Sequence, residues 1–224
     1  KPFNIYTFDD GVANIFEESL YYSNTKLSNF KRFIWKVIGV EYYMEEIKSK
    51  SKWHYSIYPD TRNIVDKVRF ISLLDFKEPV DNQGCNRLVL NYFLGQPLEE
   101  ISSLTFENFV LPVMHKYSID NYYIHPREHK EEFMDNAINF INSPQVFEDY
   151  LVKLIRDNPG VSVNVYSVIS SALLNVKHLE YVKVFYVSDK KNYNKFEKFY
   201  NLVKEKYGVS VIIENFKNEV EDVN

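Results

Sequence analysis

The side chains best suited to chemistry stand at the end of one predicted strand. Residues 121–124 are aromatic and β-branched, a composition that favours a buried strand. Pro126 then fixes its own φ and disfavours the helical region for His125, so the chain must turn there. Ligands of open α/β sheets bind at the carboxyl ends of strands, which would place His125 and Arg127 beside an anion such as a phosphate. The same residues could also form an ordinary turn with solvated charges.

A helix is predicted directly after this turn. Within residues 128–140 apolar side chains recur at helical spacing, at Phe133, Ala137 and Phe140. The first turn of such a helix has free N–H groups that could bind an anion. Strand, turn and helix together would place His125 at the mouth of a phosphate site.

Two other predicted strands end in residues that suit a phosphate. Gly95 and Gln96 follow one of them, and glycine lets a ligand approach the backbone closely. Ser170 and Ser171 follow the other and could cap a helix while donating their hydroxyls to a phosphate, although capping alone is the commoner role. Because parallel strands end at one edge of a sheet, these turns and His125 together predict a nucleotide site.

Glu148 could complete such a site. It stands early in a helix that we expect to open at Ser143 and Pro144 and to run to about Arg156. A carboxylate there could accept hydrogen bonds from both hydroxyls of a ribose. It could equally do no more than favour the helix dipole.

Asp9 lies in a separate acidic turn, Asp9-Asp10-Gly11, after a predicted strand. Aspartate and glycine are favoured in turns, which is the simplest interpretation. A metal-binding acidic pair is a second interpretation. A general base that takes a proton from an attacking hydroxyl is a third. The sequence has no P-loop, no G-x-S-x-G and no H-E-x-x-H pattern.

A parallel sheet covered by helices would bring these turns together. From residue 86 to 216 strand and helix patterns alternate, which predicts an α/β fold with a Rossmann-like domain. Residues 75–86 form the best linker. Further strands are expected at 3–8, 53–58, 87–94, 162–166, 181–187 and 209–213, and further helices at 12–22, 30–40, 106–116 and 194–206.

The composition excludes several classes of protein. The 224 residues carry a net charge of −4 and no long basic stripe, which argues against nucleic acid as a partner. Cys85 is the only cysteine, so a reducing, cytoplasmic setting is expected. We recognise no spanning apolar run and no signal peptide. Lys1 is not a natural start, so we expect the sequence to be part of a longer protein.

Four motifs in order resemble those of bacterial sialyltransferases, and the chain is most similar to the lipooligosaccharide and capsule type, glycosyltransferase family 52. Each motif is weak alone, whereas the four in order are fairly specific. They are Phe8–Gly11 (FDDG), Phe93–Leu98 (FLGQPL), Tyr123–Glu128 (YIHPRE) and Ile169–Leu173 (ISSAL).

The resemblance implies a two-domain GT-B architecture. Residues 1–84 would be the remainder of an amino-terminal, acceptor-side domain with its linker, and residues 85–224 a CMP-sugar-binding domain. The implied reaction moves sialic acid from CMP-sialic acid to a galactose-type hydroxyl of a bacterial surface glycan. It inverts the anomeric centre and uses neither metal nor cofactor.

The resemblance also assigns roles to residues. His125 would protonate or hydrogen-bond the departing phosphate, Ser170 and Ser171 would hold it, and Glu148 would bind the ribose. The other nucleotide contacts would come from Gly95, Gln96, Pro126 and Arg127. Asp9 resembles the base of related sialyltransferases, whereas in this family the base could instead be Glu99 or Glu100.

The implied partners are a nucleotide sugar and a glycan acceptor. The enzyme would work in the cytoplasm, either free or peripherally attached to the inner face of the membrane, and a homodimer is one option. Two alternatives remain: a GT-B transferase that uses another nucleotide sugar with His125 in the same place, and a non-catalytic nucleotide-binding or assembly module.

Overall fold

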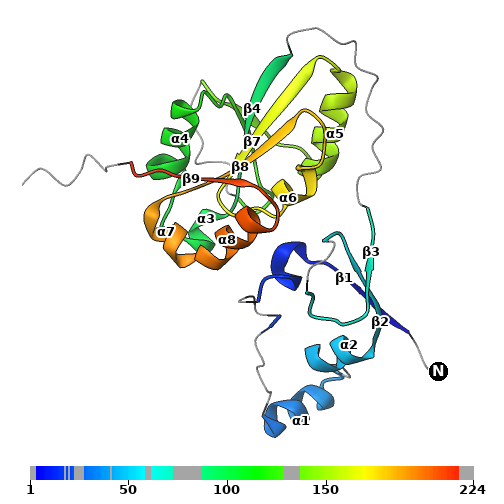
Figure 1. Cartoon of the computed structure of the whole chain (residues 1–224). Helices are drawn as coiled ribbons and strands as arrows, with labels where there is room; N and C mark the ends of the chain where they lie inside the picture. Colours follow the sequence, from blue (N-terminus) through cyan, green and yellow to red (C-terminus); the bar gives the residue numbers. More distant parts are fainter. Residues whose placement is uncertain are drawn as a thin grey trace, which may run out of the picture. The chain divides into compact units, whose positions relative to one another are not determined.

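The computed structural model describes residues 4–17, 19, 21–22, 28–40, 42–58, 62–72, 87–128 and 137–216. The chain divides into two compact units, residues 1–75 and 76–224 (Figure 1). The linker expected at 75–86 and the domain boundary expected between residues 84 and 85 lie outside the described residues.

The amino-terminal unit contains a parallel sheet in the order β1-β2-β3. The strand expected at 3–8, the strand near 53–58 and the helix at 30–40 are confirmed to within a few residues. The elements are β1 (Ile5–Phe8), the 3-10 helix η1 (Gly11–Asn14), α1 (Asn29–Val37), α2 (Met44–Lys50), β2 (Ser51–Ser56) and β3 (Val68–Phe70).

The helix expected at residues 12–22 is wrong, because only the short η1 forms there. The Asn14 side chain accepts a hydrogen bond from the backbone N–H of Asp10, and the Tyr22 hydroxyl donates to the backbone carbonyl of Asn14. The Tyr22 side chain thus occupies the Asn14 carbonyl, which a continuing helix would need as the acceptor for one of its own N–H groups.

The carboxy-terminal unit is built on a six-stranded parallel sheet, counted over the described residues, in the order β6-β5-β4-β7-β8-β9. Renumbered from its own first strand, this order is 3-2-1-4-5-6, the Rossmann order. The predicted parallel sheet is therefore confirmed. The strands are β4 (Leu88–Leu94), β5 (Asn121–Tyr123), β6 (Asn139–Ile141), β7 (Val161–Ser167), β8 (Val182–Ser188) and β9 (Ser210–Ile213).

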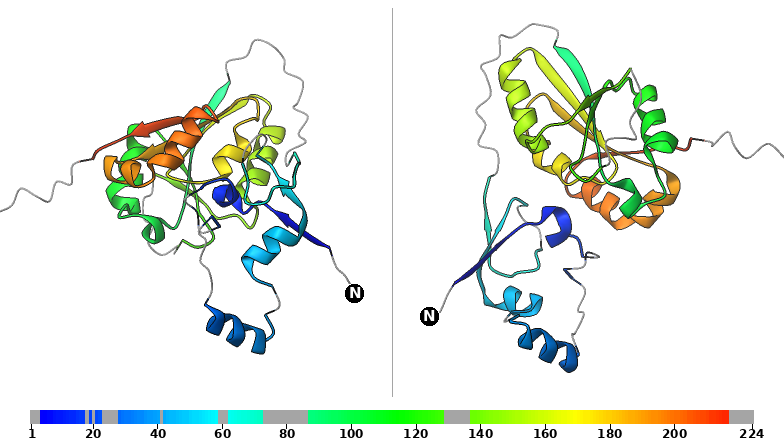
Figure 2. Two further views of the ribbon diagram at one scale, coloured as in Figure 1. Left: turned by 60° about the horizontal axis from the view of Figure 1, so that its bottom comes forward. Right: turned by 180° about the vertical axis from the view of Figure 1, so that it is seen from behind.

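Helices cover both faces of this sheet, and α4 and α5 lie on opposite faces (Figures 1 and 2). Tyr122 stands on the face that packs against η2, where its ring contacts Phe106 edge to face. Tyr123, the next residue, points to the other face and contacts Phe147 of α5. The helical elements are α3 (Leu98–Ile101), the π-helix η2 (Phe106–Val110), α4 (Leu111–Lys116), α5 (Phe147–Asp157), α6 (Ala172–Val176), α7 (Lys190–Lys195) and α8 (Glu197–Glu205).

The helix expected through Phe140 is wrong, because residues 139–141 form strand β6. Phe140 packs its ring against Tyr122 and Phe106, and β6 pairs in parallel with β5. Tertiary pairing of a short aromatic run has overridden a helical spacing that rested on few residues. Phe133 of the expected helix lies outside the described residues.

The expected helix start at Ser143 and Pro144 is also wrong, since α5 begins at Phe147. The Ser143 hydroxyl instead accepts a hydrogen bond from the N–H of Gln145, two residues on, and the Tyr123 hydroxyl donates to the Gln145 carbonyl. These bonds hold the segment as a turn. The helices expected at 106–116 and 194–206 form, each as two consecutive elements: η2 with α4, and α7 with α8.

Candidate active site

The turns after β4 and β7 are joined by one side chain. The Gln96 amide oxygen accepts hydrogen bonds from the backbone N–H of Ile169 (2.8 Å) and from the hydroxyl of buried Ser167 (3.2 Å). β4 and β7 are the neighbours at which a Rossmann sheet changes direction, where ligands of such sheets bind. Gln96 therefore links the turns after β4 and β7 at this edge of the sheet and brings its own turn next to Ser170.

The His125 turn is a closed four-residue turn. The N–H of Glu128 donates to the carbonyl of His125 (3.0 Å), and Pro126 occupies the second position, where its fixed φ is favourable. The N–H of Arg127 donates to Nδ1 of the imidazole (3.1 Å), so a neutral ring carries its proton on Nε2. Burial and the Arg127 charge lower the pKa of His125, which leaves the ring mostly neutral at pH 7.

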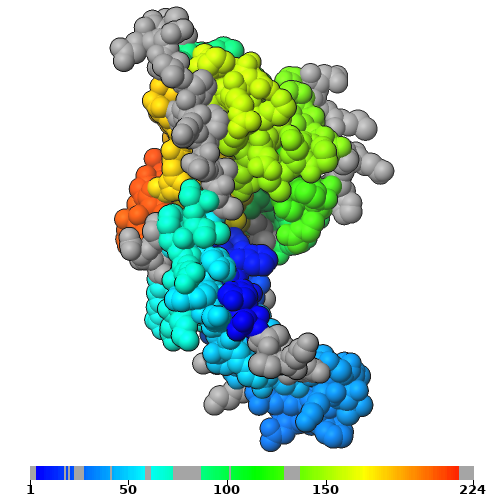
Figure 3. All heavy atoms as spheres, turned by 90° about the vertical axis from the view of Figure 1, so that its right-hand side faces the viewer, coloured from blue at the N-terminus to red at the C-terminus, as the bar shows by residue number. Residues whose placement is uncertain are grey.

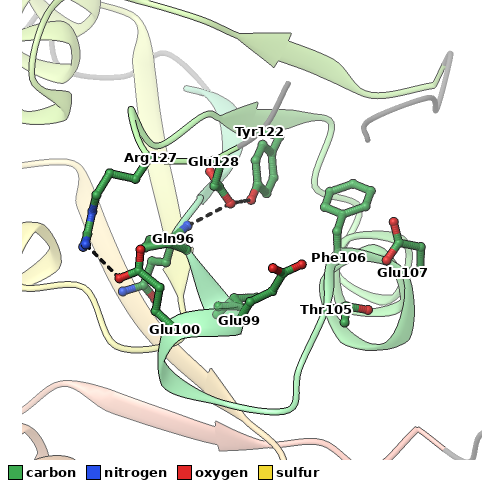
Figure 4. Close-up of a pocket in the computed structure, with 11 residues that line it drawn as sticks. Gln96, Glu99, Glu100, Thr105, Phe106, Glu107, Tyr122, Arg127 and Glu128 are labelled. Atoms are coloured by element: carbon green, nitrogen blue, oxygen red, sulfur yellow. Dashed lines mark hydrogen bonds and ion pairs between the residues drawn. The ribbon is translucent and has the colours of Figure 1, made fainter. Parts of the chain in front are cut away.

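Glu128 accepts three hydrogen bonds at the base of this turn. Two of the donors, the N–H of Gln96 (3.1 Å) and the hydroxyl of Tyr122 (2.5 Å), are drawn in Figure 4. The third donor is the N–H of His125 (2.7 Å). Burial raises the pKa of Glu128 to about 7, although these donors favour the charged form. Sequence reasoning gave this glutamate no role. The spacing His-x-x-Glu could have revealed it, because a glutamate in that position commonly reaches back to the first N–H.

A pocket of about 240 Å³ opens beside the turn, lined in part by Glu99, Glu107 and Phe106 (Figure 4). At its rim Arg127 forms an ion pair with Glu100, with Nη1 and Oε2 separated by 2.7 Å. The ion pair places Glu100, one of the three candidate bases, next to the His125 turn.

Ser170 and Ser171 lie where they were expected, at the start of α6. The Ser170 hydroxyl accepts a weak bond from the N–H of Ala172 (3.3 Å) and can still donate its proton. Ser171 occupies the N-cap position of α6 without a side-chain capping bond. Glu148 in the first turn of α5 accepts a bond from the Asn175 amide (2.7 Å), which brings its carboxylate to α6.

Asp9 belongs to the amino-terminal unit, so its distance from the other candidates is not defined. Its carboxylate is almost buried, with 6% of the side chain exposed, and accepts from the ring of His54 (2.9 Å) and the N–H of Ile57 (2.7 Å). The other nitrogen of His54 bonds to Thr7. His54 itself is fully buried.

The described part of the chain contains no group of three His, Cys, Asp or Glu side chains arranged to hold a metal ion. Nor does any of its helices have the length and apolarity to cross a membrane.

A Rossmann-type sheet places a histidine, an arginine and two serines at its carboxyl edge, where ligands of such sheets bind. The chain belongs to glycosyltransferase family 52, whose sequence profile matches residues 1–191.

Three curated relatives are similar over most of the chain. The CMP-N-acetylneuraminate:beta-galactoside alpha-2,3-sialyltransferase of Pasteurella multocida is 30% identical over 173 residues, which cover 76% of this chain and 52% of that protein. The N-acetyllactosaminide alpha-2,3-sialyltransferases of Haemophilus influenzae and Neisseria meningitidis are each 29% identical, covering 79% and 81% of this chain and 55% and 48% of theirs. The chain thus spans about half the length of the curated relatives it matches.

Gly95 is expected to tolerate no side chain. A Cβ at this position would lie 2.3 Å from the Glu128 carboxylate and 2.7 Å from the Tyr122 hydroxyl. Overpacking of this kind costs about 1–3 kcal/mol, so Gly95→Ala should lower the free energy of unfolding by that amount in urea titrations. Gly160→Ala is the matched control, because nothing lies within 4 Å of its added Cβ. Equal stability of the two variants would contradict the close approach at Gly95.

Proposed function

We propose that the protein containing this chain is an inverting sialyltransferase that uses CMP-sialic acid as its donor. One observation carries the proposal: in a chain of family 52, the turns bearing His125, Gln96 and Ser170 are hydrogen-bonded into one edge of a Rossmann sheet. The acceptor would be a galactose-type hydroxyl of a surface glycan such as lipooligosaccharide or capsule. The relatives are CMP-N-acetylneuraminate:beta-galactoside and N-acetyllactosaminide sialyltransferases, which supports CMP-sialic acid as donor and a galactose-type acceptor.

The chain's residues suggest how the CMP phosphate leaves. Sialyl transfer passes through a state with oxocarbenium character, and negative charge grows on the departing phosphate. The neutral His125 ring would donate its Nε2–H to that phosphate, and a bound phosphate would also favour protonation of the ring. The hydroxyls of Ser170 and Ser171 would donate to the same group, and Glu148 would accept from the ribose.

The base that takes the proton of the acceptor hydroxyl would be Glu100 or Asp9. Glu100 is half exposed and is held by Arg127 beside the His125 turn, within reach of an entering sugar. The carboxylate of Asp9 is instead almost buried, with its oxygens engaged by His54 and Ile57. These contacts favour Glu100 as the base.

A GT-B architecture and independence of metal complete the proposal. The Rossmann unit would be the donor-binding half, and the parallel sheet of residues 5–70 part of the acceptor-side half. A single phosphate leaves less charge to neutralise than a diphosphate, so a histidine, serine hydroxyls and Arg127 would suffice without Mg²⁺.

Donor preference tests the proposed substrate. CMP should bind more tightly than UMP, and its dissociation constant should be the same in EDTA as in Mg²⁺, since side chains alone would hold the phosphate. Isothermal titration calorimetry with CMP, UMP, UDP and GDP measures this. A strict Mg²⁺ requirement or a preference for UDP or GDP would favour a transferase with another nucleotide sugar.

His125→Ala tests the role of the histidine. In the full-length protein kcat should fall by about a hundredfold, the usual scale for one general acid or oxyanion donor. The unfolding midpoint should change little, since His125 is a partly exposed turn residue. His178→Ala, an exposed histidine of the same unit, is the control and should keep its activity. Normal turnover of His125→Ala would refute the mechanism.

We also propose that α1 attaches the protein peripherally to an anionic membrane surface. Its apolar residues Phe30, Phe33 and Val37 are 72%, 66% and 70% exposed and share one face at helical spacing, with Lys31 and Lys36 outside that face. α1 is the mid-blue segment at the bottom of Figure 3. Residues 28–40 contain no acidic side chain, although Glu45 pairs with Arg32. An exposed apolar face beside cationic side chains is typical of helices that lie in the lipid headgroup region.

Vesicle binding tests this surface. The protein should sediment with vesicles of phosphatidylglycerol and phosphatidylethanolamine, and less so at high salt because the attraction is partly electrostatic. Phe33→Ser should weaken binding by about tenfold through lost apolar burial. Phe70→Ser removes an exposed phenylalanine from β3 and should not. A protein that does not bind vesicles would contradict the proposal. If Phe33→Ser instead converts a dimer into a monomer, a second copy of the chain covers α1.

A further inference from the structure

Glu128 connects the two turns that bear Gln96 and His125. Its Oε1 accepts from the N–H of Gln96 (Figure 4) and its Oε2 from the N–H of His125, so one carboxylate binds the backbone of both turns. The third donor, the Tyr122 hydroxyl, comes from β5 beneath them. The group therefore joins β4, β5 and the His125 turn at the sheet edge.

The carboxylate sits in a rigid frame. Tyr122 is 1% exposed, and its ring stacks on Phe93 at 5.9 Å between centroids and meets Phe106 edge to face at 5.3 Å. Its hydroxyl is thus fixed by packing. Gly95 also contributes, because it has no side chain and an added Cβ would overlap both the carboxylate and the Tyr122 ring. Glu128 is thus held by hydrogen bonds to two turns and to a buried ring.

We propose that Glu128 is a positioning residue for the transfer reaction, whose ionised carboxylate fixes the backbone of His125 and Gln96 and so aims the imidazole at the departing phosphate. The role of Glu128 in catalysis rests on the proposed function. Its effect on the position of His125 depends only on this chain and can be tested without measuring turnover.

The protonation state of Glu128 should control this alignment. The ionised group accepts all three bonds, whereas a protonated oxygen presents a hydrogen toward donors that already point at it. Two titratable residues, Tyr122 and His125, donate hydrogen bonds to the Glu128 carboxylate. Four further charged residues stand around the neighbouring pocket: Glu99, Glu100, Glu107 and Arg127.

The pH dependence follows from the raised pKa of Glu128, about 7 in the folded protein against 4.5 for a free side chain. Between these values the folded state binds the proton and the unfolded state does not. The stability gained from neutral Glu128 is therefore full below pH 4.5 and lost as the pH rises through 7. Alignment of His125 has the opposite dependence and should improve as Glu128 ionises.

The experiment compares the parent chain with Glu128→Gln, and with Glu205→Gln, an exposed glutamate of α8, as control. An amide keeps the shape but can accept at only one of its two positions, so one backbone N–H loses its partner. The imidazole resonances of His125 in labelled protein should shift. The parent should show a step near pH 7 as Glu128 titrates, and the variant should lack it. In the full-length protein kcat should fall about tenfold or more with KM nearly unchanged, as for misplaced groups.

Unchanged His125 resonances and an unchanged pH profile in folded Glu128→Gln would overturn the positioning role. If that variant does not fold, Tyr122→Phe serves instead, since it keeps the ring and removes one donor to the charged carboxylate. It should move the step near pH 7 upward, and an unmoved step would overturn the proposal. If the His125 resonances shift as expected but the full-length protein transfers no sialic acid, the proposed function is wrong and the positioning role of Glu128 is kept.

Discussion

The pairing of β4 with β7 is the constraint on which the site depends. The chain leaves β4 toward β5 and β6, and later returns beside β4 to build β7, β8 and β9. In sheets of this order ligands bind at the carboxyl ends of such a strand pair. Gln96 links the two turns there with hydrogen bonds to Ser167 and Ile169. The turns of His125 and Ser170, which are far apart in sequence, lie on either side of the Gln96 turn because β5 and β7 both pair with β4.

Beneath the site, burial and hydrogen bonding act in opposite directions on the pKa of Glu128. Burial alone would keep this carboxyl neutral, and three donors alone would keep it charged. The result is a pKa raised to about 7, so the charge of Glu128 changes near neutral pH. Perturbed pKa values of this kind cluster at functional sites.

Much of this arrangement could be predicted from the sequence, because the seven-residue runs of β4 and β7 lead into the turns of Gly95 and Ser170. The His125-Pro126 dipeptide marks the turn after the shorter β5. β6 could not be predicted, since a three-residue strand exists only through its pairing with β5. The partners of Glu128 were equally hidden, because they come from three separate elements. His54 gave no signal of burial, as its environment depends on Asp9 and Thr7 from a neighbouring strand.

The central claim is that a cytidine nucleotide binds at the carboxyl edge of the β4–β7 pair. Amide chemical shifts recorded as CMP is added to the chain test it most directly. The account predicts that the largest changes fall on Gln96, His125 and Ser170. A second pocket, lined by Arg87 and Lys183 near the amino ends of the strands, offers cations at the other edge. Changes centred there, with the residues of the carboxyl edge unmoved, would contradict the account.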